Sequence, residues 1–460
     1  MNRYIAHCVV ALCLICTGCS GVKHLTKPQD NVPDKFTLNL DNDSACMAEL
    51  DWWEFYSDST LCGFISHTLE HNRDLLSAAS RIQQAKELHG VDKANLFPQI
   101  NGSVYANDET NDYSGTGIMH DREIGVKFPI TWEMNLLGSA IWASKRGKSG
   151  FLASIEDYRA MQVLLIAETA KAYYRLVALE NELAIIRRTV ETRKESLRMA
   201  KIRFEGGLTS ETVYQQAMVE YATAASLVPN LRQKITSARN ALTLLMGELP
   251  NDTLTSGMNS LDPIQLEKLP VGVPSQLLER RPDIRGAQQR LSAAKSNVGY
   301  TYAERFPSLQ LGFTPGFENN ELAKFLQSPF TFIVGSVAGS VFDFGRRKHK
   351  YKAAIAEYDQ ARFKYEKTVI QAFTEVNTAI NAYKAARRSS KLKIELCQAA
   401  SKYNKLAELQ YRGGSLNYID VLDAQRKYFD AQIDESNAII DEYLALIDLY
   451  KVLGGGWTLN

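Results

Sequence analysis

The sequence lacks an excess of charge of either sign. Its 53 lysine and arginine residues stand against 52 aspartate and glutamate residues, so the formal net charge at pH 7 is +1. Proteins that bind nucleic acid typically carry a basic surplus clustered on one face. The composition therefore gives no support for nucleic-acid binding, and 45% hydrophobic and 23% charged residues are usual for a folded protein.

Long apolar runs are also missing. Beyond Cys19 there is no stretch of 18 or more apolar residues, so we expect no membrane-spanning helix there. The apolar segment at residues 5–16 follows Arg3 and is too short to cross a bilayer. A basic residue followed by a short apolar segment is typical of a secretory signal, and we expect residues 1–18 to be a signal peptide.

The end of this segment, Cys-Thr-Gly-Cys-Ser, resembles the cleavage box of bacterial lipoproteins. Cys19 would then be the lipidated first residue, carrying palmitate, although Cys16 stands where leucine is usual. Ser20 resembles the residue found in lipoproteins that are sent on to the outer membrane. An ordinary cleavable signal is the alternative interpretation.

Cysteines are few and unsuited to a metal site. Once the signal peptide and Cys19 are set aside, Cys46, Cys62 and Cys397 remain, at no spacing typical of metal ligands. Export would permit a disulfide between Cys46 and Cys62, and free buried thiols are the other interpretation. We therefore expect no metal and no cofactor.

Glycine and proline are absent from residues 346–412, a run of 67 residues. A helix of this length, at ~1.5 Å per residue, would be a rod of ~100 Å. Apolar residues recur in it at spacings of 4, 3, 4 and 3, the heptad pattern of a coiled coil, at Val369, Phe373, Val376, Ile380 and Tyr383. A second rod, at about 139–205, has the same spacing at Val163, Ala167, Ala170, Tyr174 and Val177.

The chain contains an internal repeat. Residues 63–98 and 272–307 align without a gap and share 13 of 36 residues. Both rods end at a double glycine, Gly206-Gly207 and Gly413-Gly414, and a further helix follows each. Each half therefore reads as helix, strand, strand, long helix, glycine turn, helix. We expect a tether at 19–50, a first repeat at 51–250, a linker at 251–270 and a second repeat at 271–457.

Between the short and long helices lie segments with the alternating pattern of strands, at about 99–132 and 308–343. Leu309, Leu311 and Phe313 alternate with smaller or polar residues. The segments are ~10 residues long, enough for a tilted strand to cross a bilayer. Aromatic residues lie near their ends, as in the girdle of a membrane barrel or, alternatively, in the core of a soluble sheet: Tyr113, Phe128, Trp132, Phe317, Phe330 and Phe342.

Four strands cannot close a membrane barrel, because common membrane barrels have at least about eight. In lipid no strand edge can stay unpaired, since no water satisfies its N–H and C=O groups. If the strands cross a membrane, several chains must therefore share one barrel. Two chains would give a barrel filled by side chains, and three would give twelve strands with room for a lumen.

The chain resembles the outer-membrane factor family, the TolC-type channel-tunnels of tripartite pumps, and in particular its OprM-like lipoprotein branch. The resemblance rests on Cys19 and on the motifs DWWEFYSDSTL, NRDLLSAASRI, LFP, GVPSQLLERRPDI, RFP, FDFGRR and YIDVLDAQR, and it covers nearly all of the mature chain. It implies a mainly α fold with membrane β-strands. Three chains would form a twelve-stranded outer-membrane barrel, continued by a periplasmic α-helical barrel.

The resemblance also implies partners and a task. A periplasmic adaptor and an inner-membrane transporter, of the resistance-nodulation-division type, would load a passive, gated conduit that is not an enzyme. Export of drugs or other toxic small molecules is the leading expectation. Type I protein secretion and metal efflux by the same channel are the alternatives.

The same resemblance places the gate at the tip of the long helices, within GGSLNYIDVLDAQ. Asp420 and Asp423 match the tip aspartates of the family, and Ile419 its apolar constriction residue. Tyr418 and Arg426 would join links that hold the tip shut. Threefold symmetry would place each aspartate in a ring that favours cations, whereas ordinary solvated acids at a helix start are the simpler interpretation.

Two other classes of protein fit parts of the sequence. His67, Glu70 and His71 match H-x-x-E-H, the motif of an inverted zinc peptidase. In the second copy Gln276 and Arg280 replace the two histidines, so the position works as a scaffold without a metal. A structural coiled-coil lipoprotein is the second alternative, and it would require the strands to be soluble hairpins.

Overall fold

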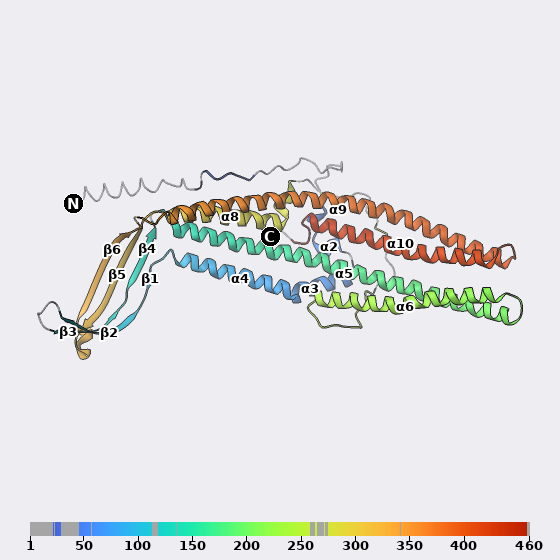
Figure 1. Cartoon of the computed structure of the whole chain (residues 1–460), viewed down its shortest axis with the longest axis horizontal. Coiled ribbons are helices and arrows are strands. Elements are labelled where there is room, and N and C mark those ends of the chain that lie inside the picture. Colours follow the sequence, from blue (N-terminus) through green and yellow to red (C-terminus); the bar gives the residue numbers. More distant parts are fainter. Residues whose placement is uncertain are drawn as a thin grey trace. The chain divides into compact units, whose positions relative to one another are not determined.

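The computed structural model describes residues 22, 24–28, 46–56, 58–112, 118–135, 137–257, 263–264, 271, 275–340 and 342–457. The expected signal peptide, Cys19, Tyr113 and most of the expected linker lie outside the described residues. The chain divides into two units (Figure 1). The sheet unit comprises residues 1–30, 80–156 and 286–368, and the helical unit comprises residues 31–79, 157–285 and 369–460.

Helices make up most of the described chain. The α-helices are α2 Trp52–Phe55, α3 Ser59–His71, α4 Arg73–Ala94, α5 Ser139–Glu205, α6 Glu211–Leu245, α7 Gln276–Arg280, α8 Pro282–Ala303, α9 Arg346–Arg412 and α10 Tyr418–Val452. Two short 3-10 helices are η2 Met47–Glu49 and η3 Leu322–Gln327. Each of the two rods, α5 and α9, is 67 residues long. None of the helices in the described ranges combines the length and apolar character that crossing a membrane requires.

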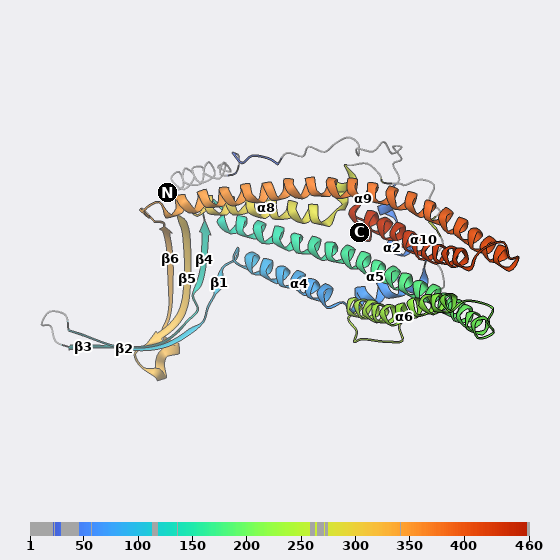
Figure 2. The same ribbon diagram turned by 45° about the vertical axis from the view of Figure 1, so that its right-hand side comes forward.

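Among the described residues the sheet unit contains six antiparallel strands: β1 Gln99–Ile100, β2 Ser103–Asp112, β3 Ile118–Lys127, β4 Ile130–Asn135, β5 Ser308–Asn319 and β6 Pro329–Ala338. Figure 2 shows β1, β4, β5 and β6 side by side. β5 is central: it pairs with β6 along one edge and with β3 and β4 along the other. β2 extends the sheet from β3, and β1 extends it from β4.

The four strand segments expected from the sequence appear as six strands because two of them are interrupted. Asn101 and Gly102 separate β1 from β2, and Phe128 and Pro129 separate β3 from β4. Proline has no N–H to donate to a ladder. The interruptions face each other, since the Asn101 N–H donates to the Pro129 carbonyl at 3.0 Å.

One chain leaves this sheet incomplete. Within the described residues, β6 has no partner on its outer edge and neither β1 nor β2 has one on the opposite edge. Neighbouring residues of a strand point to opposite faces, and Phe332 and Ile333 are 58% and 77% exposed. Apolar side chains are thus uncovered on both faces of the sheet in a single chain.

The helical unit buries the heptad seams. In α9, Val376, Ile380 and Tyr383 are almost fully buried and pack in one core with α10. In α5, Ala170 and Val177 are equally buried, in a core shared with α3 and α10. The apolar spacing of the two rods therefore determines which faces are covered within one chain.

Both halves end their helices in the same way. Gly207, Gly247, Gly414 and Gly454 have positive φ values of 71–84°, and each follows a helix whose last carbonyls are satisfied by a six-to-one hydrogen bond. For α5, the Leu208 N–H donates to the Arg203 carbonyl at 2.8 Å. This is the glycine-dependent Schellman ending, and it turns the chain back at each tip.

Candidate functional site

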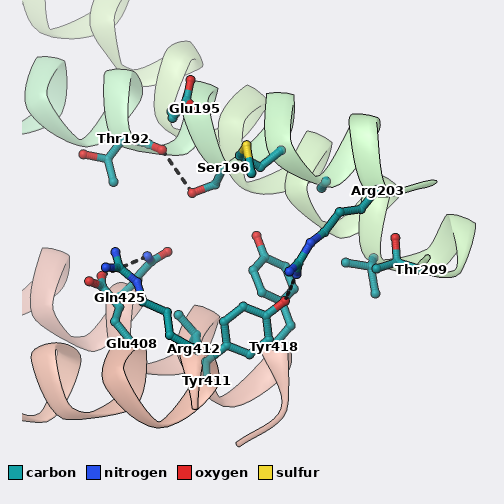
Figure 3. Close-up of a pocket in the computed structure, with 14 residues that line it drawn as sticks. Thr192, Glu195, Ser196, Arg203, Thr209, Glu408, Tyr411, Arg412, Tyr418 and Gln425 are labelled. Carbon is teal, nitrogen blue, oxygen red and sulfur yellow. Dashed lines mark hydrogen bonds between the residues drawn. The ribbon is translucent and has the colours of Figure 1, made fainter. Parts of the chain in front are cut away.

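The two helical tips lie in the helical unit, where α5 turns into α6 and α9 turns into α10. A cavity of about 510 Å³ separates the two helix pairs near these turns. Its walls are formed by α5, the turn that follows it and the start of α6 on one side, and by α9 and α10 on the other (Figure 3). The tips are the part of the molecule to which the resemblance assigned a gate.

The predicted gate residues lie in the first two turns of α10. Asn417 precedes the helix, Ile419 is 62% exposed, and the Asp420 N–H donates to the Asn417 carbonyl. Asp423 is partly exposed, and its Oδ2 lies 2.8 Å from Lys427 Nζ. Residues at i and i+4 share a face of a helix, so Ile419 and Asp423 present an apolar and an acidic side chain side by side.

Arg426 is held by a network that joins three helices. Its Nη2 donates to Glu220 Oε1 of α6 at 2.8 Å, and Arg193 Nη1 of α5 lies 3.1 Å from Glu220 Oε2. Arg193 also donates to the Glu220 carbonyl at 2.9 Å, and its side chain is only 7% exposed. One carboxylate thus neutralises two guanidinium groups and connects α5, α6 and α10 within a single chain.

The protonation of this network follows from burial. Burial lowers the pKa of Arg193, while Glu220 partly offsets this effect. The hydrogen bond to Glu220 raises the pKa of Arg426. Both arginines carry their charge at neutral pH, because even a lowered arginine pKa stays far above 7. The network is therefore a fixed electrostatic contact between the helix pairs.

Tyr418 lies in the cavity wall beside Tyr411, with ring centroids 5.6 Å apart. Burial raises its pKa, and its hydroxyl has no hydrogen-bond partner among the described residues. Tyr411 instead accepts a hydrogen bond from Arg203 of α5 at 2.8 Å, as Figure 3 shows. Of the two predicted linking residues, Arg426 makes a contact between the helix pairs. Tyr418 only lies beside such a contact, the one between Arg203 and Tyr411.

Sequence reasoning missed Arg193, Glu220, Arg203 and Tyr411. The contacts Arg203–Tyr411 and Glu220–Arg426 join positions 208 and 206 residues apart, and Arg193–Glu220 joins two separate helices, so no local pattern could reveal them. The internal repeat offered one signal: at an offset of 207, the counterpart of Glu220 is Lys427, and that of Arg193 is Ala400. The two tips differ where a charged residue of one half aligns with a neutral residue, or with a residue of opposite charge, in the other half.

The residues of the H-x-x-E-H motif lie in α3. His67 Nε2 lies 2.9 Å from Glu248 Oε1, and the His67 and His71 rings stack with centroids 4.2 Å apart. Among the residues that the structure describes, no group of three potential ligands could hold a metal ion. The two histidines pack against each other and against the end of α6.

The cysteines are not paired with one another. Cys46, Cys62 and Cys397 are free thiols. The Cys46 thiol donates to the Val271 carbonyl, and the Cys62 thiol donates to the Tyr56 carbonyl. Burial raises the pKa of both thiols. Of the two interpretations open at the sequence level, the structure has free thiols.

Comparison with known proteins gives a consistent result. A family model described as "Outer membrane efflux protein" matches residues 64–248 and again 273–455. The toluene efflux pump outer membrane protein TtgC of Pseudomonas putida is 30% identical over 420 residues, covering 89% of this chain and 86% of that protein. The cation efflux system protein CusC of Escherichia coli is 28% identical over 465 residues, covering 97% of each.

A solved structure extends the likeness to the fold. The open state of the Neisseria gonorrhoeae MtrE outer membrane channel superposes with a TM-score of 0.81 at 26% sequence identity. The superposition covers 94% of this chain and 97% of that one. The two ranges matched by the family model also coincide with the two halves of the internal repeat.

Proposed function

This chain belongs to the outer membrane efflux protein family, and we propose that three copies of it form the outer-membrane conduit of a tripartite efflux pump. The channel-tunnel fold and the role of an outer-membrane efflux channel follow from the family. The conduit performs no reaction of its own. It passes small toxic molecules that a resistance-nodulation-division transporter of the inner membrane delivers through a periplasmic adaptor.

The observation that carries the trimer is the incomplete sheet. Within the part of the chain that the structure describes, both of its edges are unpaired, and apolar residues are uncovered on both faces. Lipid tolerates no open strand edge. Pairing β6 of each copy with β1 and β2 of the next closes the sheet. Each chain has four strand segments, because β1 and β2 form one interrupted segment and β3 and β4 another, so three copies supply the twelve strands of the proposed barrel.

Cross-linking tests this closure. In a background with the three mature free cysteines replaced by alanine, one cysteine is placed at Ser336 of β6 and one at Ser103 of β2. Mild oxidation should produce dimer and trimer bands that reducing agent removes, with neighbouring positions scanned to find the register. Cysteines at Ser103 and at Gln310 of the central strand β5 are the control. If no cysteine pair along the two edges gave more cross-linking than this control, the proposed closure would be contradicted.

We propose that Ile419, Asp420 and Asp423 form the narrow part of the conduit, and that Arg426 holds the tips together through Glu220. The tip glycines Gly206, Gly207, Gly413 and Gly414 mark the end that the adaptor contacts. The support is the exposure of Ile419 and the shared face of Ile419 and Asp423. Threefold symmetry would bring three copies of each aspartate close together and favour cations.

Conductance in planar bilayers tests the gate. Asp423→Ala and Ile419→Ala should each raise the conductance of the resting channel severalfold, because they remove charge or bulk from the constriction. Gln216→Ala and Thr212→Ala, at the equivalent positions of the first half, are matched controls that should leave it unchanged. Equal conductance in the mutants and controls would remove the gate assignment and leave the conduit untouched.

We also propose that Cys19 is lipidated and anchors the mature chain in the outer membrane. Radiolabelled palmitate should label the wild type, and Cys19→Ala should lose the label. Cargo is tested by deleting the gene and comparing accumulation of antibiotics, organic solvents and metal ions. A defect confined to metal ions would favour cation export over drug export.

A further inference from the structure

The start of α9, within the sheet unit, is strongly basic. The first seven residues of α9 include five lysine and arginine residues: Arg346, Arg347, Lys348, Lys350 and Lys352. We name these five the basic collar. All except Arg347 have exposed side chains. The collar begins eight residues after β6 ends at Ala338, so it lies where the sheet passes into the helix.

Little within the chain neutralises this charge. Arg347 Nε lies 3.7 Å from Asp343 Oδ2, and Lys350 Nζ lies 3.8 Å from Glu304 Oε2. Among the described residues, Arg346, Lys348 and Lys352 have no carboxylate within ion-pair distance. Cations at the start of a helix are also unfavourable, because that end carries the positive pole of the helix dipole. The arrangement costs stability unless an external anion lies against it.

The first half of the chain shows that the fold does not require the collar. At an offset of 207, the first seven residues of α5 read SAIWASK and contain a single basic residue, Lys145. Gly138 and Gly345 precede the two rods and have positive φ values of 66° and 83°. The same backbone transition therefore works without clustered charge.

Exposed aromatic side chains lie beside the collar. Phe342 and Phe344 are 74% and 89% exposed, and their ring centroids are 4.6 Å apart. Phe344 has a φ of 52°, the only positive value among the described residues other than glycine. A bulky residue held in this unfavourable region while almost fully exposed gains nothing from the fold itself. Aromatic rings next to basic residues are typical of a membrane–water interface.

The N-terminal segment contacts the first turns of α9. His24 Nε2 is 3.3 Å from the Tyr351 hydroxyl, and the Tyr358 hydroxyl donates to the Thr26 carbonyl at 2.8 Å. These contacts hold the segment along α9, with Tyr351 inside the collar. Cys19, whose lipidation is proposed above, is five residues before His24 in the sequence. Acyl chains on Cys19 would enter the membrane close to the collar.

We propose that the basic collar, with Phe342 and Phe344, binds the headgroups of anionic phospholipids in the membrane leaflet that faces the helices. The lysines and arginines would neutralise lipid phosphates, and the two rings would enter the acyl boundary. The inference rests on the proposed function, because it takes the sheet to be the membrane-embedded part. Clusters of basic residues next to a membrane segment bind anionic lipids in this way.

The test measures lipid binding by the purified wild-type complex in a neutral detergent. Dioctanoyl-phosphatidylglycerol and dioctanoyl-phosphatidylcholine are titrated separately, and the thermal unfolding midpoint reports binding, since a ligand of the folded state raises it. The wild type should bind the anionic lipid roughly tenfold more tightly, given three or more unpaired cations near the headgroup. This preference should weaken as salt is raised.

Matched variants locate the site. The variant Lys348→Gln, Lys350→Gln, Lys352→Gln should lose most of the preference. The variant Lys364→Gln, Lys367→Gln, Lys384→Gln removes the same charge from exposed positions farther along α9 and should keep it. Phe344→Asn, which fits the left-handed backbone better, should reduce binding of both lipids. Because the wild-type preference is measured without any substitution, a variant that fails to assemble does not remove the test.

Three results would overturn the proposal. The wild type could bind the two lipids equally, or the collar variant could retain the full preference. Alternatively, glycerol phosphate, which has no acyl chain, could raise the midpoint as much as the anionic lipid does, which would make the collar a site for a soluble anion. In each case normal conductance and trimer cross-linking would show that the conduit itself stands.

Discussion

The two halves of the chain share a backbone plan and differ in surface chemistry. Asn72, before α4, donates to the Leu245 carbonyl at the end of α6, and Arg281, before α8, donates to the Val452 carbonyl at the end of α10. The accepting residues are 207 positions apart. The repeat therefore keeps the contacts that set helix ends, even when the donor changes from an amide to a guanidinium. Function is best sought where the halves diverge.

The divergence is concentrated at two places. At the tip, Val213 and Gln216 of the first half align in sequence with Asp420 and Asp423 of the second. At the start of the rods, a nearly neutral sequence in α5 stands opposite the basic collar in α9. A trimer would contain six similar halves, so each of these features would occur three times, in every second half. A difference between the two halves of one chain would thus alternate around the axis of the trimer.

The largest expected effect breaks a shared helix ending. At Gly247 a β-carbon would lie 2.4 Å from the His71 carbonyl oxygen, whereas at Gly454 the nearest atoms are 3.3 Å away. Gly247→Ala should therefore lower the free energy of unfolding by about 3 kcal/mol or more, and Gly454→Ala by less. Both variants carry the left-handed strain, but only at Gly247 does the β-carbon come within 3.0 Å of a backbone atom.

Gly207→Ala and Gly414→Ala are the controls for this comparison. Nothing lies within 4 Å of a β-carbon at either position. Only the left-handed conformation then carries a cost, about 1 kcal/mol. Thermal unfolding midpoints in detergent would rank the four variants, and four equal midpoints would show that the close contact at Gly247 has no consequence.

A medium effect separates the charges of the two tips. Glu220→Gln leaves the buried Arg193 without its carboxylate and should cost about 2 kcal/mol, because an uncompensated buried charge is unfavourable. Its counterpart Lys427 is 63% exposed, so Lys427→Gln should cost nearly nothing. The same thermal measurement applies, and a loss for Lys427→Gln that matches Glu220→Gln would contradict the buried network.

The smallest effect depends on pH. His89 of α4 is buried, and its counterpart in α8 is the buried Val298. Burial lowers the pKa of His89, and Lys93 and Lys148 lower it further while Asp92 opposes them. The unfolded chain, with a histidine pKa near ~6.5, therefore binds more protons than the folded chain in mildly acidic solution. Above a pH of about 6.5, His89 is neutral in both states and its lowered pKa costs no stability. As the pH falls below this value, the unfolded chain takes up a proton that folded His89 resists, and the free energy of unfolding decreases.

Replacing His89 with the residue of the other half sharpens this comparison. The midpoint of the wild type should fall between pH 8 and pH 5.5 by more than that of His89→Val, with a difference of at most about 1 kcal/mol. Unfolding curves at the two pH values give the result. An identical pH dependence in both proteins would mean that His89 titrates alike in the folded and unfolded states.

Much of the fold could be predicted from the sequence because its signals are local and repeated. The glycine turns at Gly207 and Gly414 and the heptad spacing of Val376 and Ile380 each arise from residues close together in the chain. The interruption at Phe128 and Pro129 was visible as a proline, but its match with Asn101 depends on strand register. The network of Arg193, Glu220 and Arg426 depends on how separate helices align, which no local pattern records.

Native mass spectrometry of the detergent-purified protein shows whether one chain supplies only a third of a closed sheet. We expect a single species with the mass of three mature chains that forms conducting channels in planar bilayers. A monomer that remains folded and stable in water without detergent would contradict it.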